Sequence, residues 1–413
     1  MSLDPSAPVK LRPLDVRPIM QNGQQAYWLR DPLALSEHKA VMPAPLAPLL
    51  ALCDGTRNVA GLRASLAVRY GLPLSEAAVL RILAALDDAL LLDNERARQA
   101  QAEALAIYRA AAQRVSPLAG ESYPAEADAL RRYLDGFAPG DAAAADDLGA
   151  LRGLISPHID YARGGATYAR TWGAVGTTAR AAELVVILGT DHYGGPGRIT
   201  LTRQSYATPY GALPTAVGLV DRLADALGGE AAYAEELHHR SEHSVELSAV
   251  WLHHTRQGQP CALVPILCGS FHEFVQGARD PGADPAINAF VAALRPALAE
   301  RPSLVVASGD LAHMGPAFGG QPLGIVDKAV LKAADEAMLA AICAGGTGGT
   351  GDAEAFLAGI RAEGDRRNVC GVPAIYLLLR LLAPAQGRLI TYDQCPADER
   401  QTSWVSVCGL ALS

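Results

Sequence analysis

Paired cysteines are missing from this sequence. Its seven cysteines include no CxxC pair, which argues against a zinc knuckle. An odd number of cysteines does not suit a disulfide framework, and the opening residues Met1–Pro5 lack the pattern of a signal peptide. We therefore expect a cytoplasmic protein in a reducing environment.

Positive charge and long apolar runs are also scarce. Lysine and arginine number 35 against 43 aspartates and glutamates, so the net charge is −8, and no basic tract occurs. This balance argues against nucleic acid as a partner. No apolar run reaches the roughly 18 residues of a membrane-spanning helix, so we expect no contact with a membrane. Half of the 413 residues are hydrophobic, which suffices for a large core in two or three domains.

Several common catalytic motifs are absent. There is no GxSxG elbow and no HExxH helix. The glycine-rich run 345–351 has the look of a phosphate loop, but it lacks the P-loop lysine and follows a helical pattern instead of a strand. We interpret it as a surface loop.

The first block of the chain, residues 1–94, combines extended patches with short helices. Residues 11–19 and 25–29 look extended. Helices are predicted at Val59–Tyr70, capped by Thr56 or Asn58, and at Glu76–Leu86, opened by Ser75, and a short strand is predicted at 90–93. This order suggests a small winged-helix-like unit. Its few arginines lie among acidic neighbours, so contact with a protein or peptide, or packing between domains, is favoured over DNA binding.

Residues 95–115 form a polar, alanine-rich helical connector, and the rest of the chain, 116–413, alternates strands with helices after an Ala/Asp-rich loop at 140–147. This alternation predicts an α/β fold with a mixed, largely parallel sheet flanked by helices.

Three predicted strands share one pattern, in which an apolar run ends in a loop that carries a histidine. The loops after 151–155, 184–188 and 304–307 contain His158, His192 and His313. Loops that follow parallel strands meet in one crevice of an open α/β sheet. The three histidines are therefore candidates for metal binding or proton transfer. Asp191 and Asp310, on the same loops, either orient an imidazole or cap the loop.

The segment 238–246 is the densest ionisable stretch. Ser241 is a plausible N-cap, which places His243 and Glu246 on one face of the first helical turns, and we assign both to the site. We interpret the other histidines of this region, namely His238, His239, His253 and His254, as solvated.

Cys370 stands just before the apolar helix 374–382. A thiol at a helix N-terminus tends toward the thiolate, which is the form that binds metal or attacks a substrate. The other cysteines lie mostly in apolar runs and are interpreted as packing.

Residues 116–413 resemble the Memo family, whose bacterial members are called AmmeMemoRadiSam system protein B. The resemblance rests on six ordered motifs, namely 119–124, 154–158, 186–192, 242–246, 307–313 and 369–371, with 264–267 and 403–409 in support. This family shares its fold with the class III extradiol dioxygenases.

The resemblance implies a set of site residues. His158, His192 and Cys370 would hold a divalent metal, with iron first and copper or zinc as alternatives. His313 would be the acid–base group, and Asp310 and His243 would line the pocket. This sequence departs from the usual family pattern at Asp160, Asp191 and Tyr193, and the added carboxylates leave the identity of the metal open.

The front block resembles the winged-helix units of PqqD, a peptide-binding module, through Arg30–Pro32, Leu52–Arg57 and the helices after Val59. Two functions follow as hypotheses. The first is a non-haem metal-dependent redox or dioxygenase-like enzyme that acts on a small organic molecule. The second is a non-catalytic metal- or peptide-binding protein that keeps the pocket.

Overall fold

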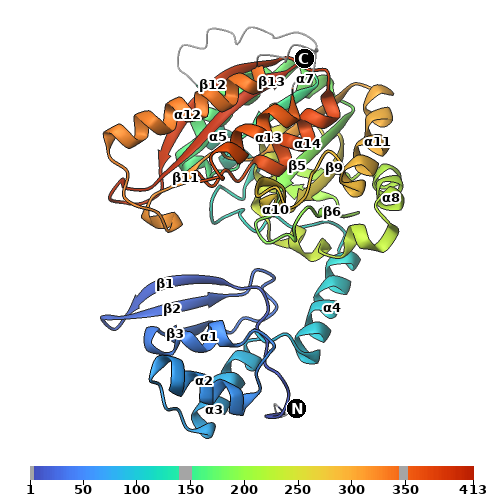
Figure 1. Cartoon of the computed structure of the whole chain (residues 1–413). Coiled ribbons are helices and arrows are strands. Elements are labelled where there is room, and N and C mark those ends of the chain that lie inside the picture. Colours follow the sequence, from blue (N-terminus) through green and yellow to red (C-terminus); the bar gives the residue numbers. More distant parts are fainter. Residues whose placement is uncertain (1–3, 139–150, 344–351) are drawn as a thin grey trace. The chain divides into compact units, whose positions relative to one another are not determined.

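The computed structural model describes residues 4–138, 151–343 and 352–413. The chain divides into two compact units, Met1–Ala110 and Ala111–Ser413 (Figure 1). The loops that the sequence predicts at 140–147 and 345–351 lie outside the described residues. Among the described helices, none is both long and apolar enough to cross a bilayer.

The first unit contains a small antiparallel sheet in the order β1-β2-β3. Asn22 and Gly23, both with positive φ, close the tight hairpin between β1 and β2. Asn58 caps α2, Gly71 ends it in the left-handed conformation, and Ser75 caps α3. The elements are β1 (Asp15–Gln21), β2 (Gln24–Arg30), β3 (Ala40–Pro43), η1 (Ala44–Leu46), α1 (Pro48–Leu52), α2 (Val59–Tyr70), α3 (Glu76–Asp88) and α4 (Glu95–Ala110).

The prediction of a strand at 90–93 is wrong. Leu92 makes only an isolated bridge with Leu11. Leu90 adopts a positive φ of 58° directly after α3, which turns the chain away from an extended path. The apolar run is explained by burial, because Leu91 and Leu92 complete the core of this unit.

The second unit is built on an eight-stranded mixed sheet in the order β11-β13-β4-β10-β5-β9-β6, with β12 paired to β13. Its centre, β4, β10, β5 and β9, is parallel, whereas the outer strands pair in antiparallel fashion. The strands are β4 (Gly153–Ser156), β5 (Leu184–Thr190), β6 (Ile199–Leu201), β9 (Ala262–Cys268), β10 (Ser303–Ser308), β11 (His313–Met314), β12 (Gly387–Pro396) and β13 (Trp404–Leu412), and β7 (Tyr206–Thr208) and β8 (Gly211–Leu213) form a separate hairpin.

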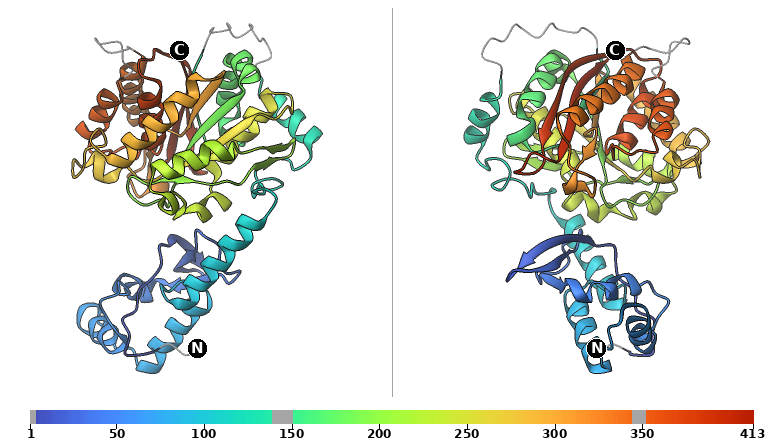
Figure 2. Two further views of the ribbon diagram at one scale, coloured as in Figure 1. Left: turned by 90° about the vertical axis from the view of Figure 1, so that its right-hand side faces the viewer. Right: turned by 60° about the vertical axis from the view of Figure 1, so that its left-hand side comes forward.

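Helices cover both faces of the sheet (Figures 1 and 2). Side chains of β5 alternate between the two cores, with Val186 on one face and Val185 on the other. Because both faces are covered, the central strands are apolar throughout. The helices are α5 (Ala127–Asp135), α6 (Tyr161–Ala174), α7 (Gly176–Ala181), α8 (Val217–Ala226), α9 (His243–Thr255), α10 (His272–Val275), α11 (Pro285–Ala299), α12 (Ile325–Cys343), α13 (Ala353–Ala362) and α14 (Val372–Leu382), with 3-10 turns η2 (Gly229–Tyr233), η3 (Glu236–Arg240) and η4 (Pro316–Phe318). This arrangement confirms the predicted α/β class.

Two glycines bring helix starts against the carboxyl ends of the central strands. A Cβ at Gly189 would lie 2.5 Å from Ser244 Oγ, at the start of α9. A Cβ at Gly309 would lie 2.5 Å from the Cα of Gly371, at the start of α14. Contacts this close leave no room for a methyl group, so glycine at these two positions sets how near both helices come to the sheet.

We predict that Gly309→Ala destabilises the protein by about 1–3 kcal/mol, because the methyl group overlaps the backbone of Gly371. The measurement is the urea midpoint at constant slope. Gly173→Ala is the matched control, because a Cβ there meets nothing within 4 Å and alanine is the better helix former. Equal midpoints for the two variants would contradict the proposed contact.

Candidate metal centre

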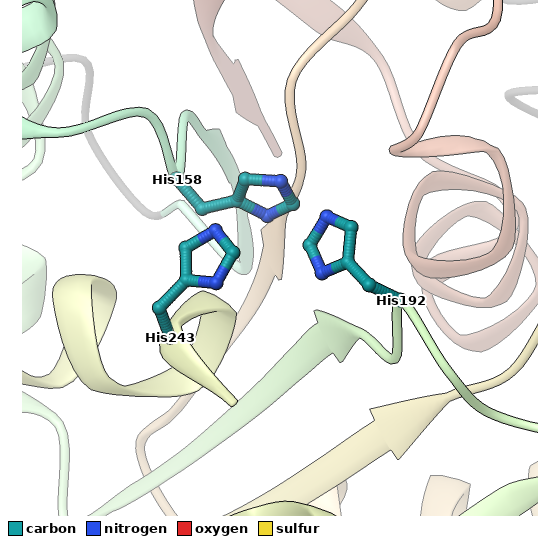
Figure 3. Close-up of side chains that lie close together, drawn as sticks. All are labelled: His158, His192 and His243. Atoms are coloured by element: carbon teal, nitrogen blue, oxygen red, sulfur yellow. The ribbon is translucent and has the colours of Figure 1, made fainter. Parts of the chain in front are cut away.

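Three histidines meet at the carboxyl edge of the sheet. His158 follows β4, His192 follows β5, and His243 opens α9, and one ring nitrogen from each lies within 4.8 Å of the others. Their rings surround one point (Figure 3), with centroids 4.8–5.2 Å apart. His158 is buried, whereas the side chains of His192 and His243 are 31% and 39% exposed. The cluster is therefore open to solvent on one side.

The ring of His158 is fixed from the neighbouring strand. Its Nδ1 lies 3.0 Å from the carbonyl oxygen of Ser308, which can only accept, so Nδ1 carries the hydrogen and Nε2 keeps its lone pair. Burial lowers the pKa of His158 to about 3. The ring is thus neutral at pH 7, which is the form that binds a metal.

Glu242 orients the other two histidines. Its Oε2 accepts a hydrogen bond from His192 Nδ1 at 3.0 Å, and its Oε1 lies 3.0 Å from His243 Nδ1. Burial raises the pKa of Glu242, but the two histidines outweigh burial and hold it well below its usual range. A carboxylate that receives Nδ1–H leaves Nε2 free for a metal, as in the carboxylate–histidine pairs of metalloproteins.

Glu242, and not Ser241, is the N-cap of α9. Its carboxylate accepts the backbone N–H groups of His243 and Ser244 at 2.7 and 3.0 Å. The sequence prediction of Ser241 was therefore wrong by one residue, and it missed the role of Glu242. The signal in the sequence was a carboxylate directly before the first histidine of the helix. A hydrogen-bond acceptor at that position can bond the N–H groups of the helix start and also an imidazole.

Cys370 forms a second group with His158 and Asp310. Its Sγ lies 3.2 Å from His158 Nε2, and the three ligand atoms lie within 4.8 Å of one another. Ligand nitrogen and sulfur in a tetrahedral zinc site are about 3.5 Å apart, given Zn–N of about 2.0 Å and Zn–S of about 2.3 Å. The donor set therefore fits a divalent ion, and His158 belongs to both groups.

The thiolate expected at Cys370 is not the resting form. Burial raises its pKa to about 11, although His192 acts in the opposite direction. Burial outweighs the helix N-terminus, so the thiol keeps its proton until a metal replaces it. On His192 the balance is reversed, because Glu242 and Cys370 outweigh burial and raise its pKa.

Asp310 braces the His158 loop. Its Oδ1 accepts the backbone N–H groups of His158 and Ile159 at 2.8 and 3.1 Å, and its Oδ2 lies 3.9 Å from His158 Nε2. The carboxyl group is buried. Asp310 therefore holds the loop in place and also borders the ligand cluster.

His313 lies in neither ligand group. It opens β11, its Nδ1 lies 3.2 Å from the carbonyl oxygen of Leu311, and its ring packs edge-on against Phe318. Burial lowers its pKa, although Asp310 and backbone hydrogen bonds to Leu311 and Asn368 act in the opposite direction, so the ring is neutral near pH 7. It borders a cavity of about 180 Å³ that Met314, Phe318, Arg366 and Asn368 also line.

Glu246, which the sequence assigned to the site, is a structural residue. Its fully buried carboxylate binds Arg114 Nη2 at 2.7 Å and the hydroxyl of Tyr123 at 2.6 Å. The sequence could not show this, because these partners lie more than 120 positions away.

Asp160, one of the unusual carboxylates, caps α6 and pairs with Arg163, so it takes no part in the cluster.

The four histidines that the sequence analysis interprets as solvated have hydrogen-bond partners in the protein, so that interpretation is wrong. His239 and His253 are buried, and each makes two hydrogen bonds, the first to Tyr206 and Thr200 and the second to Thr208 and Gly258. His254 bonds the hydroxyl of Tyr210. His238 bonds Asp191 at 2.8 Å. Long-range partners made these residues part of the interior.

We predict that Glu242→Gln weakens zinc binding by roughly 10–100-fold, because the amide no longer fixes both imidazoles as a carboxylate does. Competition against a chromophoric chelator measures the affinity. Asp160→Asn is the control, since this carboxylate also lies near His158 but only caps α6. The same affinity in both variants would exclude the orienting role of Glu242.

We also predict that the cobalt-loaded protein has a thiolate-to-cobalt charge-transfer absorption that Cys370→Ser removes and Cys343→Ser keeps. Sγ of Cys370 lies within ligand range of His158, whereas Cys343 ends α12. A wild-type spectrum without this absorption would mean that the three histidines hold the ion without the thiol.

Comparison with known proteins identifies the family of the second unit. The profile of the family described as Memo-like protein matches residues 114–411. A MEMO1 family protein of Thermus thermophilus is 27% identical over 279 residues, which cover 67% of this chain and 75% of that protein.

Two further relatives are MEMO1 family proteins of Aquifex aeolicus and Methanosarcina acetivorans. The first is 25% identical over 243 residues, which cover 59% of this chain and 62% of the relative, and the second is 27% identical over 161 residues, which cover 39% and 54%. The chain thus spans less than two thirds of the length of these two relatives. The profile match covers well over half of the chain, including every residue of the metal centre. The chain therefore belongs to the Memo family.

Proposed function

We propose that this protein is a metal-dependent redox enzyme that acts on a small organic molecule. The observation that carries the proposal is that two groups of ligand side chains share His158, the first with His192 and His243 and the second with Asp310 and Cys370, and that His192 is partly exposed. Iron is the first candidate for the ion, with copper or zinc as alternatives, because imidazole and thiolate ligands suit all three. A bound iron ion would supply electron transfer to dioxygen or substrate.

The residues around the centre orient the ligands and transfer protons. Glu242 orients His192, and Ser308 orients His158. His313 is neutral and borders the neighbouring cavity, so we assign to it the transfer of a proton from a hydroxyl group placed there. A proton-transfer group must reach the substrate, which is consistent with its place outside both ligand groups.

The cavity beside His313 supports a small substrate. Its volume of about 180 Å³ is below the range of about 300–1,000 Å³ typical of drug-sized ligands. Phe318 and Met314 offer apolar contacts, and Arg366 and Asn368 offer polar ones. A small ring that carries hydroxyl groups combines both requirements.

We predict that His313→Ala keeps the metal but lowers turnover by about 10²–10⁴-fold, the usual contribution of a general acid or base. Oxygen consumption with candidate catechols, measured on anaerobically iron-loaded protein, reports turnover, and elemental analysis reports metal. The matched control is His272→Ala, an exposed histidine in α10.

Two results would change the proposal. If His313→Ala loses the metal as completely as Cys370→Ala, a closed structural site is the better interpretation. If the wild-type protein consumes no oxygen with any metal, the alternative of a non-catalytic binding protein takes its place.

A second candidate function, peptide binding, is favoured by a groove in the first unit. The groove, of about 820 Å³, lies between β3 and α3 and is lined by Val41, Met42, Ile82 and Ala85, with Arg81 and Arg96 among its polar residues. Within the described residues β3 pairs only with β2. An edge strand beside an apolar groove can accept an extended peptide as an additional strand.

We predict that Ala85→Arg weakens the binding of a peptide selected by display against the full chain by at least about tenfold, because the new side chain fills the groove. Ala84→Arg is the control, since Ala84 is exposed one position away and does not line the groove. Fluorescence anisotropy with the labelled peptide measures both. Equal affinities would place the peptide elsewhere.

A further inference from the structure

A separate group of metal-ligand side chains lies behind the His192 loop. Asp191 follows β5 and directly precedes His192, Glu235 is the N-cap of η3, and His238 lies within η3. One ligand atom from each of Asp191, Glu235 and His238 lies within 4.8 Å of the others. Neither the family resemblance nor the redox proposal gives this group a role.

The local backbone explains why these three side chains meet. A 3-10 helix has three residues per turn, so positions i and i+3 lie on the same side. Glu235 is the N-cap of η3, and the N–H of His238 bonds its carbonyl oxygen at 2.9 Å. Glu235 and His238 therefore project together. After the end of β5, Asp191 contacts His238 of η3, whereas the ring of the next residue, His192, lies against the ring of His158.

The two carboxylates are held by the turn after β5. Asp191 is buried, and its Oδ1 accepts the N–H of Tyr193 at 3.1 Å. A Cβ at Gly194 would lie 2.7 Å from Asp191 Oδ2, so glycine leaves room for this carboxylate. Glu235 accepts the N–H of Gly195 at 3.1 Å. One oxygen of each carboxylate lies within 4.8 Å of the other two ligand atoms of the group.

We propose that Asp191, Glu235 and His238 form a second site for a divalent transition-metal ion, beside the first centre but separate from it. One imidazole and two carboxylates are a ligand set that zinc and manganese accept. His238 Nδ1 and Asp191 Oδ2 are 2.8 Å apart. An opening of about 0.5 Å gives the edge of about 3.3 Å expected between two ligands of a tetrahedral ion with bonds of about 2.0–2.1 Å.

The charges near the group favour a cation. Asp191 and Glu235 are joined by the neighbouring carboxylate of Glu242, and the facing basic group on the turn is Arg198, whose Nε lies 3.7 Å from Glu235. Arg198 is 48% exposed, so solvent screens it. The side chain of His238 is 15% exposed, which leaves a path for an ion and for a water ligand.

An ion at this second site would help to hold the ligand His192 of the first centre in place. An ion bound by Asp191 would tie the turn after β5 to η3, and the residue after Asp191 is the ligand His192. Without an ion, the His238–Asp191 hydrogen bond and the Arg198–Glu235 ion pair make a weaker version of the same connection. This inference does not depend on the redox proposal, because it concerns the number of ions bound and not turnover.

The experiment counts ions on the full-length chain. Chelator-treated protein is dialysed against Zn²⁺, and the bound zinc per chain is measured by elemental analysis. Wild type is expected to bind two ions, and Glu235→Gln and His238→Gln are expected to bind one. His272→Gln is the matched control and should keep two, because His272 is exposed in α10.

A reciprocal variant separates the two centres. His158→Gln should also bind one ion, and His158→Gln combined with His238→Gln should bind none. Cobalt absorption from Cys370 should persist in Glu235→Gln, which shows that the chain is folded and the first centre intact. The inference is overturned if wild type binds only one ion, if Glu235→Gln and His238→Gln still bind two, or if either variant loses both.

Discussion

The candidate metal centre depends on one buried carboxylate. Glu242 accepts the first N–H groups of α9 and at the same time contacts Nδ1 of His192 and of His243. A buried carboxylate without partners would be strongly unfavourable. Here the helix start and two imidazoles stabilise its charge, and in return it fixes the direction of both rings. The same group therefore sets where α9 begins and where the ligand nitrogens point.

Around Glu242 the sheet topology supplies the other ligands. The parallel strands β4, β10 and β5 are neighbours, so the loops after their carboxyl ends converge. Glycines at the ends of β5 and β10 let the starts of α9 and α14 approach within van der Waals range. His158 and His192 lie in the loops that follow β4 and β5, and His243 and Cys370 lie at the starts of α9 and α14. Strand ends and helix starts thus position the members of the cluster.

The protonation states at this site are unequal, and burial is the reason. Burial keeps His158 neutral and keeps Cys370 as a thiol. Glu242 instead raises the pKa of His192 and favours its protonated form. Binding of a divalent ion at His192 and Cys370 must release protons, so affinity rises with pH through the range in which these groups lose them. The same low-polarity surroundings that raise the pKa of the thiol would strengthen the bond between its thiolate and a metal ion.

The sequence by itself determined the α/β class, the positions of the central strands and the histidines that follow them. Apolar runs and the alternation of strands with helices are local properties, and His158 and His192 lie where parallel strands must end. It did not determine the partners. Glu246 looked like a site residue until its bonds to Arg114 and Tyr123 were seen.

Only the tertiary structure decided which polar groups face one another. The contact of Glu242 with His192, the protonated thiol of Cys370 and the contact between His238 and Asp191 all depend on residues far apart in the chain. Local pattern fixes which face of an element is apolar, whereas burial and the pKa of a group depend on everything packed around it. Hydrogen bonds and desolvation act over a few ångströms of space and not along the sequence, and for that reason the chemistry of the site could be read only from the fold.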